Sequence, residues 1–236
     1  KVWKLFKRSD IPTGRKVIGN RWVFAIKDSG IFRSRTVAKG FSQIPGKDHQ
    51  KNHAPVVHDT TLHMVMVIKI QYNLKKRQFD IVTAFLYGKL KELLYMEFPE
   101  GYEEYLLEKK GAIFESKHYC LLIKKVLYGL VQAARQWWKK ITEVLNKLGF
   151  VSSKADPCLF VKAGNGKEPP AFIVLYVDDG GIIGTPEVIE EVMKALSKVF
   201  KIKDLGDMNT FVGCDIIDDK TTIWLQQSKL ISHLKE

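Results

Sequence analysis

Two adjacent acids at the end of an apolar run constrain the fold of this chain more than any other feature of its sequence. Residues 172–177 are all apolar, Asp178 and Asp179 follow directly, and residues 180–184 return as a glycine-rich apolar segment. Aspartate and glycine favour tight turns, and apolar runs on both sides of such a turn are typical of paired β-strands. The sequence therefore predicts a hairpin with both carboxylates at its tip.

Two stretches in which apolar residues recur at helical spacing flank this hairpin. The first runs from Ala134 to Leu148 and is followed by Gly149, a residue type that commonly ends helices. The second follows Thr185 and Pro186, which are typical of the cap and the first position of a helix. Each stretch predicts a helix with one apolar side that packs against a sheet.

Further short segments indicate how these helices and strands combine. Residues 76–81 form a β-rich run that contains Asp80, and residues 158–162 are also strand-like. The resulting order is strand, helix, strand, strand, helix, strand. This order predicts an α+β fold in which a split βαβ-type antiparallel sheet carries helices on one face.

The N-terminal region contains a second predicted hairpin. Residues 21–27 and 31–39 are β-rich and are separated by the turn signal Asp28-Ser29-Gly30. Alternation along the second arm places Arg33, Arg35 and Val37 on one face. Further along the chain, Thr60 or Thr61 is expected to cap a helix that ends near Tyr72.

Composition limits the classes of protein to which the chain can belong. It has 236 residues, 45% of them hydrophobic, and 38 Lys+Arg against 26 Asp+Glu give a formal net charge of +12. No apolar run approaches the ~18 residues of a membrane span, so we expect no membrane insertion. No signal peptide or other targeting segment is recognisable, and the positive charge favours a polyanionic partner such as nucleic acid. Three widely spaced cysteines and scattered histidines indicate neither disulfides nor zinc.

The acidic residues are the candidates for chemistry. A sheet that pairs the strand of Asp80 with the hairpin would bring Asp80 beside Asp178, so that the three carboxylates would converge. Clustered carboxylates need cations, and oxygen ligands favour Mg²⁺; two such ions support phosphoryl transfer. Taken alone, however, the Asp-Asp-Gly-Gly segment also has the composition of an ordinary turn, and that alternative stays open.

The segment Tyr176-Val177-Asp178-Asp179 resembles the signature of a reverse transcriptase, and an ordered series of other segments resembles the copia-type class of long-terminal-repeat retrotransposons. The resemblance extends from about Trp3 to Ile216. Its further segments are RWVF at 21–24, RTVAKGFSQ at 35–43, APVV at 54–57, DIVTAFLYG at 80–88, YMEFPEG at 95–101, LYGLVQAAR at 127–135, ADPCLF at 155–160, KDLG at 203–206 and FVG at 211–213.

This resemblance implies a right-hand polymerase in one domain that covers residues 1–236. The fingers would comprise mainly residues 1–75 and part of 90–127. The palm, with the split βαβ sheet, would comprise mainly residues 76–90 and 128–216. Residues 217–236 would begin the thumb or connection.

The implied activity is RNA-directed DNA polymerisation on an RNA template and a DNA primer, with deoxynucleoside triphosphates and two Mg²⁺ ions, or Mn²⁺. By motif position, the metal-binding carboxylates would be Asp80, Asp178 and Asp179, and the carbonyl of Ile81 would add an oxygen. The ribonuclease H and integrase domains of a Pol polyprotein, which are missing from this chain, would be partners.

The resemblance also implies four nucleotide-binding residues. Arg33 and Arg35 would contact the triphosphate, Phe85 would be the steric gate against a 2′-hydroxyl, and Gln132 would line the nucleotide pocket. Without the resemblance, the arginines would be a solvated basic face, Phe85 a core residue and Gln132 an ordinary polar residue near a helix start.

The chain departs from the family pattern at several positions, among them Val82, Tyr87, Ala134 and His53. The three acids are nevertheless retained. An alternative to the polymerase is therefore a catalytically degenerate or domesticated remnant that still binds nucleic acid, and a third hypothesis is a structural partner in a larger particle.

Overall fold

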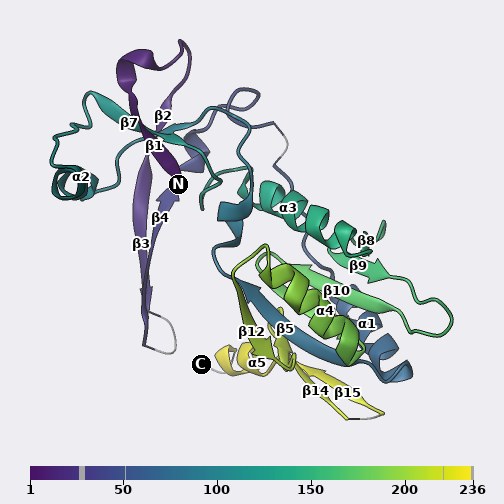
Figure 1. Ribbon diagram of the computed structural model, residues 1–236. Coiled ribbons are helices and arrows are strands. Elements are labelled where there is room, and N and C mark those ends of the chain that lie inside the picture. The colour runs from purple at the N-terminus through teal and green to yellow at the C-terminus, as the bar shows by residue number, and fades with distance from the viewer. Residues whose placement is uncertain (27–29, 51, 220, 235–236) are drawn as a thin grey trace. The chain divides into compact units, whose positions relative to one another are not determined.

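The computed structural model describes residues 1–26, 30–50, 52–219 and 221–234 (Figure 1). Within it the chain divides into two compact units. The first comprises residues 1–54 and 85–140, and the second comprises residues 55–84 and 141–236. No helix in the described ranges has both the length and the apolar character that crossing a membrane requires.

The first unit is built on a four-stranded sheet with the strand order β1-β7-β6-β2. Its strands pair antiparallel except for β2 and β6, which are parallel. The elements of this unit are β1 (Trp3–Lys7), η1 (Arg8–Asp10), β2 (Val17–Ile18), β3 (Asn20–Ile26), β4 (Phe32–Ala38), η2 (Gly40–Ser42), β6 (Tyr95–Met96), α2 (Tyr102–Lys110) and β7 (Tyr119–Ile123). The buried side chains of Ile18, Met96 and Leu121 belong to its core.

The hairpin predicted near the N-terminus is confirmed. β3 and β4 pair antiparallel over their full lengths, and Arg35 lies opposite Val23. The residues Asp28 and Ser29 of the expected turn lie outside the described residues. The face that carries Trp22, Phe24 and Phe32 is exposed, so this hairpin is not part of a two-sided core.

The second unit is built on a six-stranded antiparallel sheet with the order β12-β5-β11-β10-β9-β8. Its strands are β5 (Lys75–Ile81), β8 (Val151–Ser152), β9 (Leu159–Lys162), β10 (Ala171–Tyr176), β11 (Asp179–Gly184) and β12 (Ile202–Gly206). A separate three-stranded sheet contains β13 (Thr210–Phe211), β14 (Cys214–Asp218) and β15 (Ile223–Gln226). The helices of this unit are α1 (Asp59–Gln71), α4 (Pro186–Ser197) and α5 (Ser228–His233), while α3 (Ala133–Lys147) and the short η3 (Ala84–Tyr87) each have residues in both units.

The large sheet is covered on both faces, which corrects the expectation of helices on one face. Adjacent residues of β5 show this, because side chains alternate along a strand. Arg77 forms an ion pair with Glu190 of α4 at 2.8 Å. Lys76 points the other way and pairs with Asp218 of β14 at 2.9 Å, and Asp218 also pairs with Lys69 of α1. Figure 1 accordingly draws α4 in front of the sheet and α1 partly behind it.

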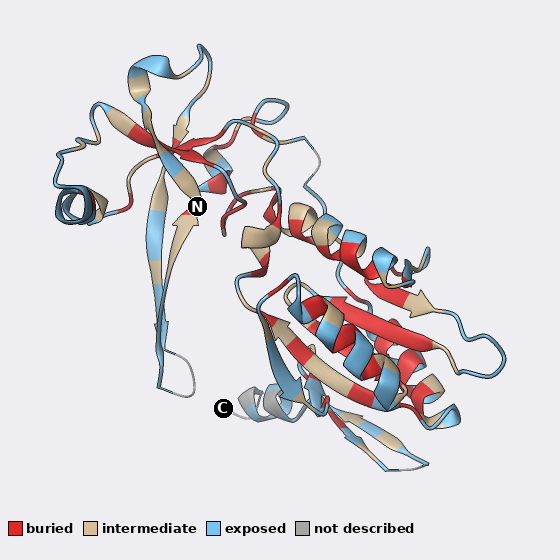
Figure 2. Ribbon diagram, viewed as in Figure 1, coloured by how far each residue is buried: buried red, intermediate tan, exposed pale blue. Residues whose placement is uncertain are grey.

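Burial on both faces explains the apolar run that the sequence shows in β10. All residues of β10 before Tyr176 are buried, and Figure 2 shows the strand in red along most of its length. A strand that alternated apolar and polar side chains would leave one face to solvent. The position of β10 inside the sheet, between β9 and β11, therefore requires this composition.

Two of the predicted helix boundaries are confirmed and one is wrong. Thr185 caps α4, because its hydroxyl accepts a hydrogen bond from the Val188 amide at 3.4 Å. Gly149 follows α3 with a φ of +83°. Helix α1, however, begins after His58, which makes no side-chain cap, so neither Thr60 nor Thr61 is the capping residue.

Candidate active site

The hairpin of β10 and β11 is tighter than expected at its tip. Tyr176 pairs with Asp179, so the turn contains only Val177 and Asp178. Asp178 therefore lies in the turn, whereas Asp179 is the first residue of β11, which corrects the expectation that both acids lie at the tip. Val177 has a φ of +57°, a conformation that is costly for a β-branched side chain. The backbone at the tip thus stores local strain.

Strand pairing brings Asp80 next to this tip. Asp80 of β5 lies opposite Asp179 of β11 in the antiparallel register. Directly opposite residues share one face of the sheet, with Cβ atoms about 4.5–5.5 Å apart. One residue further along β5, the backbone amide of Ile81 donates a hydrogen bond to the carbonyl of Asp178 at 3.0 Å. Two acids and the backbone of a third are therefore gathered at one end of two neighbouring strands.

The glycines of β11 make this close pairing possible. A Cβ atom at Gly180 would lie 2.1 Å from the ring of Phe79, which is completely buried beside Asp80. A Cβ atom at Gly181 would lie 2.4 Å from the sulfur of Met208 on the other face. Any side chain at either position would push the strands or their neighbours apart. The Gly-Gly segment after the acids therefore serves packing as well as turning.

The electrostatics of the site reflect this crowding. Burial raises the pKa of Asp179 to about 6, and the negative charges of Asp178 and Asp80 add to the shift. Both causes disfavour the ionised carboxylate. A bound cation would offset this cost, because it would place positive charge where like charges converge.

The donor atoms at this end of the strands fit a hard divalent cation. The three carboxylates and the backbone carbonyl of Ile81 would offer only oxygen, which Mg²⁺ and Mn²⁺ prefer. Within the described part of the chain, no three His, Cys, Asp or Glu side chains are already arranged as a finished metal site. The fit therefore rests on the chemistry of the donors and on the raised pKa of Asp179.

The register also identifies a neighbour that sequence spacing did not reveal. Lys203 of β12 lies opposite Asp80, on the side away from Asp179. Asp179, Asp80 and Lys203 therefore lie side by side across three strands, on one face of the sheet. Nothing in the sequence of residues 202–205 fixes the register of this strand against β5.

The predicted triphosphate ligands lie in the first unit. Arg33 is exposed, while Arg35 is partly buried on the same face of β4. The guanidinium of Arg35 lies over the ring of Tyr128, 5.0 Å from the ring centre. Arginine stacked in this way keeps its charge, and its orientation is restricted.

Phe85, the predicted steric gate, is partly buried in the same unit. Its ring packs against the ring of Tyr128, which also contacts Arg35, at a centroid distance of 4.7 Å and an interplanar angle of 55°. It also packs against the buried core cluster that contains Leu127 and Leu130. Both a core role and a role at a binding surface are compatible with this partial exposure.

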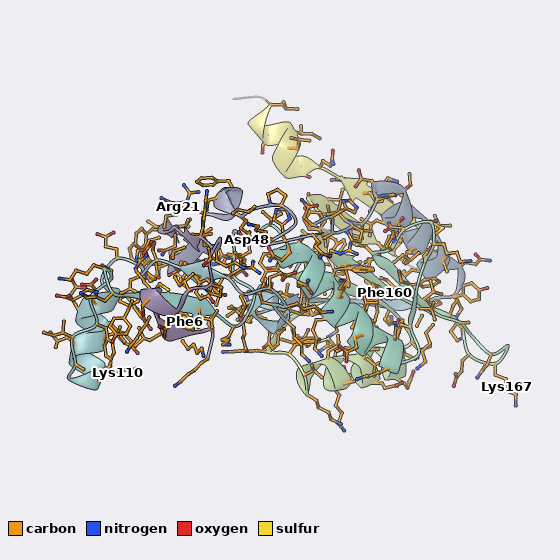
Figure 3. The ribbon with its side chains drawn as sticks, turned by 90° about the horizontal axis from the view of Figure 1, so that it is seen from above. Phe6, Arg21, Asp48, Lys110, Phe160 and Lys167 are labelled. Carbon is orange, nitrogen blue, oxygen red and sulfur yellow. The ribbon has the colours of Figure 1, made fainter. Side chains whose placement is uncertain are left out.

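The environment of Gln132 does not fit its expected role in lining a nucleotide pocket. Its side chain is only 1% exposed. Its carbonyl oxygen accepts a hydrogen bond from Gln43 at 3.0 Å, and its amide donates to the backbone carbonyl of Asp48 at 3.0 Å. Asp48, labelled in Figure 3, is itself buried and pairs with Arg15. Gln132 is therefore part of a closed polar network that joins the 43–48 segment to the start of α3.

Comparisons with known proteins agree with the motif series. The sequence model of a family described as "Reverse transcriptase (RNA-dependent DNA polymerase)" matches residues 1–236. The chain is 33% identical over 239 residues to the Retrovirus-related Pol polyprotein from transposon TNT 1-94 of Nicotiana tabacum, and the match covers 98% of the chain and 17% of that protein. It is 32% identical over 229 residues to the Retrovirus-related Pol polyprotein from transposon RE1 of Arabidopsis thaliana, which covers 94% of the chain and 15% of that protein.

A solved structure with detectable similarity is a foamy viral protease-reverse transcriptase in complex with double-stranded DNA. The similarity has a TM-score of 0.45 and 12% sequence identity, and it covers 98% of the chain and 34% of that structure. By comparison, the chain spans less than a fifth of the length of each of the two plant polyproteins.

Proposed function

Since the chain belongs to the reverse transcriptase (RNA-dependent DNA polymerase) family, in the copia-type class of transposon Pol polyproteins, we propose that it catalyses RNA-directed DNA synthesis. The observation that carries this proposal is the register of β5 against β11, which sets Asp80 beside Asp179 and next to the turn that contains Asp178. An ordinary turn would need no third acid on the neighbouring strand. The raised pKa of Asp179 supports a site that is completed by cations.

The proposed substrates are an RNA template, a DNA primer and deoxynucleoside triphosphates. All three carry phosphates, and the formal net charge of +12 favours association with them. The neighbouring ribonuclease H and integrase domains of a Pol polyprotein are proposed partners of this domain. The matches cover less than a fifth of each plant polyprotein, and this small coverage supports the proposal of further domains as partners.

In the proposed mechanism, Asp80, Asp178 and Asp179 hold two Mg²⁺ ions, or Mn²⁺ as an alternative, with the carbonyl of Ile81 as a further ligand. When bound, these ions supply positive charge that activates the attacking hydroxyl and stabilises the leaving group. The primer 3′-oxygen forms a bond to the α-phosphorus of the nucleotide. The bond from that phosphorus to the bridging oxygen breaks, pyrophosphate leaves, and the hydroxyl proton passes to solvent.

The arginines of β4 are proposed to bind the triphosphate. The planar guanidinium of Arg35 can bind two phosphate oxygens at once, and Arg33 on the same face adds positive charge. Phe85 is proposed to pack against the sugar and to disfavour a 2′-hydroxyl. The pocket role expected of Gln132 is not part of this proposal, because the residue is buried and hydrogen-bonded at both ends of its amide.

We assign the whole chain to a single polymerase domain with fingers, palm and the start of a thumb. The strand order β12-β5-β11-β10, with α3 and α4 in the connections, supports a palm of the split βαβ type. The proposed fingers are mainly residues 1–75 with part of 90–127, and the proposed palm is mainly 76–90 with 128–216. The compact units differ from these ranges at α1, which belongs to the second unit, and at residues 85–90 and 128–140, which belong to the first.

Primer extension tests the proposal. The chain is incubated with oligo(dT) annealed to poly(rA), dTTP and Mg²⁺, and incorporated dTMP is measured. We expect incorporation that requires the RNA template and that stops when the divalent ion is chelated. Tight binding of the heteroduplex without any incorporation, in Mg²⁺ or in Mn²⁺, would instead identify a nucleic-acid-binding remnant.

A further inference from the structure

Tyr128 contacts two of the proposed nucleotide-binding residues, Arg35 and Phe85. Its ring lies under the guanidinium of Arg35, with 5.0 Å between the guanidinium carbon and the ring centre. The same ring packs against Phe85 at a centroid distance of 4.7 Å. Arg35, Tyr128 and Phe85 come from three separate segments of the first unit, so this contact is a product of the fold.

The backbone holds Tyr128 firmly in this place. Residues 127–130 form a turn closed by a hydrogen bond from the Leu130 amide to the Leu127 carbonyl. The amide of Ala38, at the end of β4, donates to the Tyr128 carbonyl at 2.9 Å. Gly129 has a φ of +87°, and a Cβ atom there would lie 2.1 Å from the carbonyl oxygen of Ala38. Only glycine permits so close an approach, which fixes the turn against the strand that carries Arg35.

The packing beside the turn shows which face of β4 it covers. A Cβ atom at Gly129 would also lie 2.6 Å from a methyl group of Val37. Val37 and Arg35 share one face of β4, because side chains two residues apart along a strand point the same way. The turn therefore lies on the face of the hairpin that carries the arginine, and not on the exposed apolar face of Trp22 and Phe24.

We propose that Tyr128 is a positioning residue for nucleotide binding: its ring holds the guanidinium of Arg35 in place for the triphosphate and supports the ring of Phe85. This inference rests on the proposed function and deepens it. A long arginine side chain loses rotamer freedom when it binds phosphate. A ring that already restricts the side chain removes part of that loss before the nucleotide arrives. Tyr128 thus acts through Arg35 and Phe85.

Two substitutions at Tyr128 separate the ring face from mere bulk. Tyr128→Phe keeps the aromatic face. Tyr128→Leu keeps much of the apolar volume but removes the aromatic face. The measurement is the Kd of Mg²⁺–dTTP for the chain bound to a dideoxy-terminated primer on an RNA template, a complex that needs no turnover. We expect Tyr128→Leu to raise this Kd about 3- to 10-fold and Tyr128→Phe to change it by less than about twofold. Affinity for the primer–template should stay unchanged in both.

A double-mutant cycle with Arg35→Gln tests whether Tyr128 acts through the arginine. If it does, Tyr128→Leu should weaken dTTP binding much less in the Arg35→Gln background than in the wild-type chain. Tyr105→Leu, the same change at an exposed tyrosine of α2, is the matched control. Additive effects of the two substitutions, or an equal loss in the Phe and Leu variants, would overturn the proposal.

The contact itself has a readout that is independent of polymerase activity. Protons of the Arg35 side chain over an aromatic ring experience a ring-current shift in NMR spectra. We expect this shift to persist in Tyr128→Phe and to vanish in Tyr128→Leu, and an unchanged Arg35 spectrum in Tyr128→Leu would refute the contact. Failure of the proposed function would look different, because the wild-type chain would then incorporate no nucleotide while the ring-current shift remained.

Discussion

Asp80 on β5 lies directly opposite Asp179 on β11, and this single cross-strand pair joins two acids that are 99 positions apart in the sequence. The strands can pair this closely because Gly180, opposite Phe79, has no side chain where the Phe79 ring lies. Behind it, the sheet is buried on both faces and held by ion pairs from Arg77 on one side and from Lys76 on the other. A rigid scaffold of this kind is what a site of converging carboxylates requires.

The charge on Asp179 is expected to destabilise the chain in the absence of metal. Its folded-state pKa of about 6 lies above the unfolded value of about 4, so the cost is absent below pH 4 and complete above pH 6. Asp179→Asn should therefore raise the free energy of unfolding at pH 7 by about 1 kcal/mol, a figure reduced for the partial exposure of the group. Urea denaturation in EDTA at pH 7 and pH 4 measures this, with the exposed Asp10→Asn as control. A variant less stable than the wild type at pH 7 would contradict the assigned cause.

Gly180→Ala is expected to disturb the pairing that aligns the acids. The added methyl group would meet the buried Phe79 ring at 2.1 Å, which predicts a loss of about 1–3 kcal/mol of stability together with reduced nucleotide incorporation. Gly184→Ala on the same strand is the matched control, since its nearest contact, with the Ala171 methyl group, would be 3.3 Å, which is tight but far less severe than the contact at Gly180. Phe79→Leu should restore part of the loss in the double variant. Equal stability of the two alanine variants would show that the close packing at Gly180 does not matter.

Asp156 is expected to hold the start of α1 in a pH-dependent way. Its buried carboxylate accepts hydrogen bonds from the His58 amide, the Thr61 hydroxyl and the Cys158 amide. Burial alone would raise its pKa, but these hydrogen bonds outweigh it and lower the pKa below the usual value. The stabilisation is therefore complete above about pH 4 and is lost as the pH falls through the lower folded-state pKa.

Replacement of this carboxylate tests the prediction. Asp156→Ala should cost about 2–4 kcal/mol at pH 7, because buried donors lose their acceptor. Asp59→Asn, at an exposed position in the first turn of α1, should cost less than about 1 kcal/mol. Chemical denaturation of both variants across pH 3–7 provides the measurement. A cost for Asp156→Ala that does not shrink at low pH would argue against a charged cap.

Phe85→Ala is expected to weaken discrimination against ribonucleotides. If the ring packs against the sugar, its removal makes room for a 2′-hydroxyl and should raise the ratio of ribo- to deoxynucleotide incorporation about 10-fold or more. Phe41→Ala, at an exposed phenylalanine in the same unit, is the control. An unchanged ratio in Phe85→Ala would assign this ring to core packing alone.

Much of the architecture could be predicted from local patterns in the sequence. The β3–β4 hairpin, the cap of α4 and the glycine after α3 each depend on residues that are close together in the chain. That Asp80 meets the acidic pair could be anticipated from strand ends, but the expected neighbour was Asp178, whereas the register sets Asp80 opposite Asp179. The family segments identified the class because their order along the chain carries information that single motifs lack.

Other features could not be predicted, because they depend on contacts between residues far apart in sequence. The cap of α1 comes from Asp156, 95 positions after Thr61. Gln132 is closed into a network with Gln43, 89 positions away, so its burial has no local sequence signal. The turn tip is one residue earlier than expected, because Val177 adopts a positive φ that its residue type disfavours. Such exceptions to local rules are common at functional sites.

The most direct test of the account is single-turnover incorporation of dTMP on poly(rA)–oligo(dT) by the Asp178→Asn/Asp179→Asn double variant, compared with the wild type and the Asp10→Asn control. We expect the double variant to lose incorporation by about 10³-fold or more, since two carboxylates that hold the cations are removed. Its affinity for the primer–template and its folding should be retained. Incorporation at the wild-type rate in the double variant would contradict the central claim that these acids carry out the chemistry.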